Sequence, residues 1–99
     1  MNKINFNEAL KAARMINLSS DKVNTLTVKD ASNKFAGQIL YALSELHGPM
    51  EDEYYDAFIV KHWAESLEML EHLIQEENLT PDDEVQIIYN EETDIFEVR

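Results

Sequence analysis

Four residues in the second half of the chain have side chains and spacing that could hold a metal ion. They lie on a predicted helix at intervals of three and four residues, which places them on one helix face: Glu65, Glu68, His72 and Glu76. Carboxylate and imidazole groups are common ligands of divalent metals. A helical metal site usually points inward, however, where other helices supply further ligands, and these four lie opposite the apolar stripe that contains Trp63. We therefore predict a solvated acidic face, with neither a metal nor another cofactor.

A second concentration of charge is the stretch EDEYYD, residues 51 to 56, which holds four carboxylates and two tyrosines. Its first three carboxylates fall at the expected N-terminus of the same helix, where each interacts favourably with the helix dipole by about 0.3 to 1 kcal/mol at low salt. Helix formation explains those three. We assign the remaining carboxylate, Asp56, to a partner-binding surface, together with Tyr54 as its aromatic anchor.

The rest of this helix carries more negative charge than folding requires. Glu68 has like-charged neighbours one turn away on both sides, Glu65 and Glu71, and the one clearly attractive pair is Lys61 with Glu65. Such repulsion costs the helix on the order of 1 kcal/mol, which binding to lysine and arginine of a partner would relieve. Solubility alone is the competing explanation. The predicted partner-binding residues are Tyr54, Asp56, Glu65, Glu68, Glu71, His72 and Glu76.

The sequence lacks the usual signatures of an enzyme. It has no cysteine, no glycine-rich phosphate loop and no nucleophile elbow, and its two glycines leave little room for turns that cradle a substrate. A catalytic carboxylate pair needs one member whose pKa is raised by burial, and these acids fall mostly on predicted polar faces. His62, beside the apolar stripe, is expected at the edge of the core. We predict a protein that is not an enzyme.

Composition indicates one domain, residues 1–99, in a reducing compartment, which we take to be the cytoplasm. The formal net charge of −12 is unevenly distributed. Residues 1–44 carry six Lys/Arg against three Asp/Glu, a balance of +3, whereas residues 45–99 carry two against seventeen, a balance of −15. The acidic half should repel nucleic acid and anionic membranes and attract basic proteins. No window approaches the roughly twenty apolar residues that a membrane span needs.

The first half of the chain predicts two helices. One is capped by Asn5 and runs to about Asn17, with an apolar stripe of Phe6, Ala9, Leu10, Ala13 and Ile16. The second is capped by Thr27 and ends near Gly48 and Pro49, a left-handed C-terminal residue followed by a helix breaker. Residues 18–26 between them are compatible with a loop, a helical turn or a short strand.

The second half predicts a long helix from about residue 51 to 78 with a broad apolar face, and then a single turn that Thr80 caps and Pro81 begins. The runs VQIIYN and DIFEVR are typical of a β-hairpin, in which Asp94 takes the left-handed bulge position. A lone hairpin is marginal in water, so it must pack on the helices or gain a strand from the N-terminal region or from a second copy. The predicted fold class is α+β: a three-helix core with a C-terminal antiparallel β-hairpin.

These features favour a small non-catalytic binding protein that occludes the basic site of a nucleic-acid-binding or nucleic-acid-cleaving partner by mimicking phosphate charge. In type it is similar to the small acidic inhibitors of phages and bacteria, such as immunity proteins, antitoxins, DNA mimics and other anti-defence proteins, although no specific motif carries this similarity. One alternative is a homodimeric structural or adaptor domain that uses the apolar face of the third helix or the hairpin edge. Another is an oligomer that pairs the basic half of one copy with the acidic half of the next.

Overall fold

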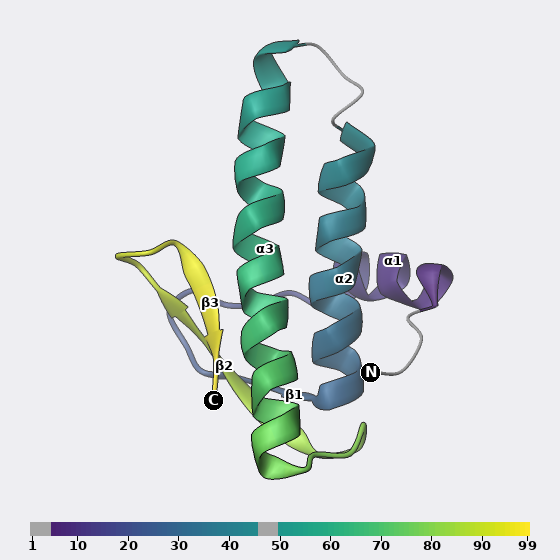
Figure 1. Ribbon diagram of the computed structural model, residues 1–99, viewed down its shortest axis with the longest axis vertical. Helices are drawn as coiled ribbons and strands as arrows, with labels where there is room; N and C mark the ends of the chain where they lie inside the picture. Colours follow the sequence, from purple (N-terminus) through teal and green to yellow (C-terminus); the bar gives the residue numbers. More distant parts are fainter. Residues whose placement is uncertain (1–4, 46–49) are drawn as a thin grey trace.

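The computed structural model describes the backbone of residues 5–45 and 50–99 and the side chains of residues 5–43 and 59–99. The prediction of an α+β fold with three helices and a C-terminal hairpin is confirmed (Figure 1). The expected stop at Gly48 and Pro49 lies outside the described residues. The elements are α1 (Phe6–Met15), β1 (Asn24–Thr27), α2 (Val28–Glu45), α3 (Met50–Glu77), β2 (Glu84–Asn90) and β3 (Ile95–Val98).

Helix α1 begins as predicted, because the Asn5 side chain accepts a hydrogen bond from the Glu8 backbone N–H at 3.1 Å. Ala9 and Ala13 of the expected stripe are buried, but Phe6 is not. Phe6 is 66% exposed, and the residues that pack inward are alanines: Ala9, Ala12 and Ala13. The reason is a close crossing with α2 at Gly37, where the two backbones leave room only for small side chains.

The undecided segment 18–26 ends in a strand. The Asn24 side chain accepts from the Ser19 N–H at 2.8 Å and donates to the Ser19 carbonyl at 2.9 Å, which closes the loop before the strand. It also donates to the Ile87 carbonyl at 3.0 Å and so ties this loop to β2. Strand β1 then pairs antiparallel with β2, and the sheet order is β1-β2-β3. The hairpin thus gains its third strand from within the same chain.

Strand β1 leads directly into α2 without a linker. Thr27 caps α2 as predicted, since its hydroxyl accepts from the Asp30 N–H at 3.1 Å. Two further N–H groups of the first turn donate to the carbonyls of Asp83 and Pro81, from Val28 at 2.7 Å and from Lys29 at 3.0 Å. The predicted single turn at Pro81 forms, closed by a hydrogen bond from the Asp83 N–H to the Thr80 carbonyl at 3.1 Å, but it is not helical, and the carbonyls of Pro81 and Asp83 serve α2.

The hairpin has the predicted conformation. Ile87 faces Val98 and Asn90 faces Ile95 in the antiparallel register. Asp94 has a φ of 64°, in the left-handed region, and its N–H donates to the Asn90 carbonyl at 2.8 Å. Asp is one of the few residue types that tolerate this conformation, which is why the turn closes without glycine.

The core lies where α2, α3 and the sheet meet. Phe35 of α2, Leu70 of α3 and Ile87 of β2 are fully buried. The Trp63 ring lies 5.9 Å from Phe35 and 5.6 Å from Phe96, so that one indole connects α2 to β3 through α3. Figure 1 shows the hairpin on one side of the α2/α3 pair and α1 beyond α2 on the other. In the described part of the chain, no helix combines the length and apolar character that a membrane span requires.

Candidate functional site

The candidate site lies on the exposed face of helix α3, because the opposite face of this helix packs in the core. Leu70 is fully buried, and Trp63, Leu67 and Ile74 pack against the same core, as the periodicity predicted. The helix ends with Asn78 in the left-handed conformation, φ 52°, and the Leu79 N–H donates back to the Ile74 carbonyl at 3.1 Å. This Schellman arrangement fixes the C-terminal turn. The acidic residues between Lys61 and Glu76 are therefore held on a rigid helix and directed outward.

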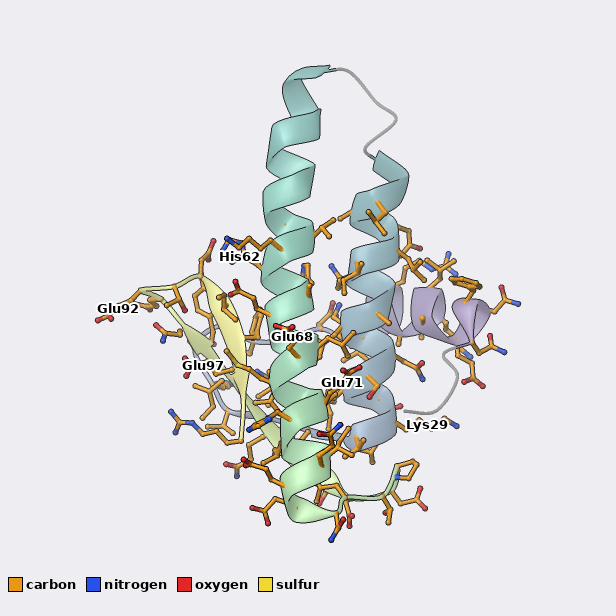
Figure 2. The ribbon with its side chains drawn as sticks, in the orientation of Figure 1. Lys29, His62, Glu68, Glu71, Glu92 and Glu97 are labelled. Carbon is orange, nitrogen blue, oxygen red and sulfur yellow. The ribbon has the colours of Figure 1, made fainter. Side chains whose placement is uncertain are left out.

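The outward face of α3 holds an open, shallow groove of about 610 Å³. Four predicted partner-binding residues contribute to it: Glu68 and His72 are exposed, and Glu65 and Glu71 are half-buried. Figure 2 shows Glu68 on the exposed side of α3 and Glu71 on the side nearer α2. Met69 and Gln75 complete the lining. We call this groove, with the adjoining Glu76, the α3 acidic face.

Charge on the α3 acidic face is largely uncompensated. Among the residues whose side chains are described, the ion pairs are His72 with Glu76, at 2.8 Å between Nε2 and Oε1, and Glu97 with Arg99. The expected attraction between Lys61 and Glu65 does not produce an ion pair in this structure. Both members of the His72–Glu76 pair are largely exposed, so it stabilises the helix by no more than a few tenths of a kcal/mol. Glu65, Glu68 and Glu71 are thus left without a charged partner within the described residues.

Two of the predicted residues, Tyr54 and Asp56, belong to the part of α3 whose side chains are not described. Their backbone is helical and continuous with the face just defined. The metal arrangement considered for Glu65, Glu68 and His72 is not assembled: across residues 5–43 and 59–99, no three His, Asp or Glu side chains converge as a ligand set. The helix spreads these groups along an open face instead of gathering them around one point.

A second concave feature, which the sequence did not reveal, lies between α3 and the hairpin. This cleft of about 180 Å³ is lined from α3 by Ile59, His62, Trp63 and Ser66, and from the hairpin and its turn by Tyr89, Asp94, Ile95 and Phe96. His62 is half-buried at this position, in keeping with the predicted edge of the core, and Figure 2 shows it extending from α3 toward the hairpin. The two halves of the lining are more than twenty residues apart in sequence, so no spacing rule could connect them. The signal that was available is the aromatic pair Tyr89 and Phe96 flanking Asp94.

Comparison with protein-family models, with curated proteins and with solved structures found no significant match.

Proposed function

We propose that this protein is a non-catalytic inhibitor that covers a basic site on a nucleic-acid-binding or nucleic-acid-cleaving partner. The observation that carries the proposal is the α3 acidic face, where three glutamates that have no charged partner among the described side chains surround an open groove on a helix. Carboxylates one helical turn apart, with Cβ atoms roughly 5 to 6 Å from each other, offer a row of negative charge to side chains that otherwise grip phosphates. The protein would compete with nucleic acid for that site.

The arrangement of charge in space supports this proposal. Lys11 and Arg14 of α1, Lys22 of the loop before β1 and Lys29 of α2 are exposed, whereas Lys34 is buried. Figure 1 shows α1 on the far side of α2 from the hairpin. Lys61 of α3 and Arg99 at the end of the hairpin are exposed as well, but these two cations face seventeen Asp and Glu residues in the acidic half and cancel only a small part of its negative field. Such a field steers a basic partner toward α3 and away from α1.

The apolar surface of α3 is used within the chain. The large hydrophobic residues that are exposed in the described regions are Phe6, Met15, Val23 and Leu43, none of them on α3 or on the hairpin. Over residues 59–77, where the side chains are described, the α3 acidic face is thus the surface of α3 that is available for a partner. Homodimerisation as an adaptor domain stays an alternative, and the experiment below separates it from inhibition.

The test passes a cell lysate over three immobilised proteins. They are the wild type, the double variant Glu65→Lys/Glu68→Lys, and a control double variant, Asp82→Lys/Glu92→Lys. Both double variants change the net charge by the same amount, but the control residues are exposed and lie outside the α3 acidic face. We expect wild type and control to retain a nuclease, polymerase or other nucleic-acid-binding protein at low salt and release it at moderate salt. The variant on α3 should bind it at least roughly tenfold more weakly, because like charges now face each other.

The captured partner must also lose activity, or nucleic-acid binding, when wild-type protein is added, and the control variant must inhibit equally. Equal retention by all three baits would reject the α3 acidic face as the binding surface. Recovery of nothing but the protein itself, at high salt as well as low, would replace inhibition with the adaptor alternative.

A further inference from the structure

The cleft between α3 and the hairpin has aromatic walls. The rings of Trp63 and Phe96 are nearly parallel, 12° apart, with centroids at 5.6 Å, and the Tyr89 ring is tilted against Phe96 at 5.1 Å. The small side chain of Ser66, which is buried, contributes to the lining, and its hydroxyl donates to the His62 carbonyl at 3.3 Å. The cleft exists because a serine, rather than a larger residue, stands at this position under the rings.

A fixed carboxylate stands beside these rings. Asp94 is exposed, and its backbone is held by the left-handed turn and by the hydrogen bond from its N–H to the Asn90 carbonyl. The Tyr89 hydroxyl donates to one oxygen of the Asp94 carboxylate. A carboxylate has about four acceptor positions, so one bond from Tyr89 leaves room for a further donor. The cleft therefore combines aromatic faces with a preorganised negative charge.

We propose that this cleft receives an arginine side chain of the partner protein. A guanidinium is planar, stacks on aromatic rings and donates in a fixed fork to a carboxylate, which matches the walls and Asp94. The cleft of about 180 Å³ is smaller than the roughly 300 to 1,000 Å³ of sites for drug-sized ligands, so it suits one side chain rather than a cofactor. The surroundings attract a cation, because residues 84–99 contain five acidic residues and one basic residue, Arg99.

The cleft also adjoins the α3 acidic face. His62 of the cleft and Glu65 of the α3 acidic face are three residues apart on α3 and are therefore neighbours on the helix surface. A partner that spans both places one arginine beside Trp63 while its other cations meet the glutamates. The assignment of a basic partner rests on the proposed function. An arginine held in a desolvated aromatic pocket is also the kind of residue that dominates binding energy at protein interfaces.

Trp63 is the single tryptophan of the chain, so its fluorescence reports on the cleft itself. The experiment titrates the wild-type protein with N-acetyl-arginine amide, and separately with N-acetyl-citrulline amide, which has nearly the same shape but no charge. We expect a saturable change in Trp63 emission with the arginine compound and none with citrulline. Asp94→Asn should weaken binding about tenfold, since a charge-assisted bond is replaced by a neutral one. Asn tolerates the left-handed conformation, so this variant keeps the turn.

The matched control is Glu92→Gln, which removes a charge from the same turn without touching the cleft. Figure 2 places Glu92 at the tip of the hairpin, directed away from α3. This variant should bind the arginine compound within about twofold of the wild type. Filling the cleft with Ser66→Leu should abolish the fluorescence response, and circular dichroism confirms that the variant is folded.

Three results would overturn the inference: no saturable response to arginine, an equal response to citrulline, or equal affinity of Asp94→Asn and wild type. An N-acetyl-lysine amide that binds as tightly would likewise exclude an arginine-specific cleft. The titration contains no partner protein, so its failure leaves the charge-reversal test of Glu65 and Glu68 unaffected. Failure of that test, in turn, does not alter the affinity of the cleft for the free compound.

Discussion

Replacing Gly37 by alanine tests the packing of α1 on α2. A Cβ at this position would lie 2.0 Å from the carbonyl oxygen of Ala9, 2.7 Å from its carbonyl carbon and 2.8 Å from the Cβ of Ala13. The first two atoms belong to the backbone, so no side-chain rotation relieves the clash. Ordinary van der Waals contact begins at 3.4 Å, and α1 must therefore move by about 1.4 Å to accommodate one methyl group.

Two effects of opposite sign determine how much Gly37→Ala changes the free energy of unfolding. Alanine favours the helical conformation of α2 over glycine by about 1 kcal/mol. Against this, overpacking costs about 1 to 3 kcal/mol. Displacement of α1 also weakens the hydrogen bond from Lys34 Nζ to the Ala13 carbonyl, which is 2.8 Å long in the wild type. A hydrogen bond of this charged kind contributes about 1.5 to 3 kcal/mol. The free energy of unfolding should fall by about 1 to 3 kcal/mol in total, which lowers Tm by about 4 to 8 °C per kcal/mol.

Thermal unfolding followed by circular dichroism measures the global change, and amide hydrogen exchange locates it. Exchange should accelerate mainly in α1, because α3 and the sheet do not depend on this crossing. Lys29→Ala is the control: the Lys29 side chain is exposed in the first turn of the same helix, so this substitution should change the free energy of unfolding by no more than a few tenths of a kcal/mol. A Gly37→Ala protein as stable as the wild type, with α1 equally protected, would refute the close crossing.

Two ionisable groups give further predictions. Burial lowers the pKa of Lys34 below its usual 10.5. The Lys34 ammonium also donates a hydrogen bond to Gln38 at 3.0 Å. The substitution Lys34→Met should reduce the free energy of unfolding by about 1 to 2 kcal/mol at neutral pH, because the Ala13 carbonyl loses its donor. Between the lowered pKa and 10.5, the unfolded chain binds more protons at Lys34 than the folded chain does, so folding becomes more favourable as the pH rises through that window. Urea titrations should therefore show the difference in free energy of unfolding between wild type and Lys34→Met growing over this pH range. A difference that shrinks would contradict the lowered pKa of Lys34. The hydrogen bond to Asp94, with the nearby carboxylates, raises the pKa of Tyr89 above 10.0. Carbon-13 NMR of the tyrosine rings should show the Tyr89 midpoint falling in Asp94→Asn, and an unchanged midpoint would exclude the hydrogen bond as its cause.

The features that the sequence predicted correctly are local ones. The caps at Asn5 and Thr27 and the left-handed position of Asp94 each follow from a side chain that bonds to, or tolerates, the backbone within a few residues. The inward face of α3 follows from a period of 3.6 residues. The exposure of Glu68 was predictable for the same reason, because a helix that buries one face in the core exposes the opposite face to solvent.

The features that the sequence did not predict depend on which distant segments of the chain pack against each other. Asn24 begins a strand because β2 is available to pair with it, whereas its own neighbours allow several conformations. Phe6 fits an apolar stripe by spacing, yet the close approach of α1 to Gly37 admits only alanines, and Phe6 stays exposed. Residues 80–83 form a hydrogen-bonded turn rather than a helical one, and the carbonyls of Pro81 and Asp83 accept hydrogen bonds from a helix more than fifty residues earlier.

The sequence by itself therefore determined the helices, the hairpin turn and the acidic face of α3, because each is governed by contacts within about one turn of chain. Tertiary structure alone decided the third strand, the close crossing of α1 and α2 at Gly37 and the cleft beside Trp63. The cleft is the clearest case. Its aromatic rings and its carboxylate come from two elements, and the distance between them is set by the packing of the hairpin on α3, which no local pattern specifies.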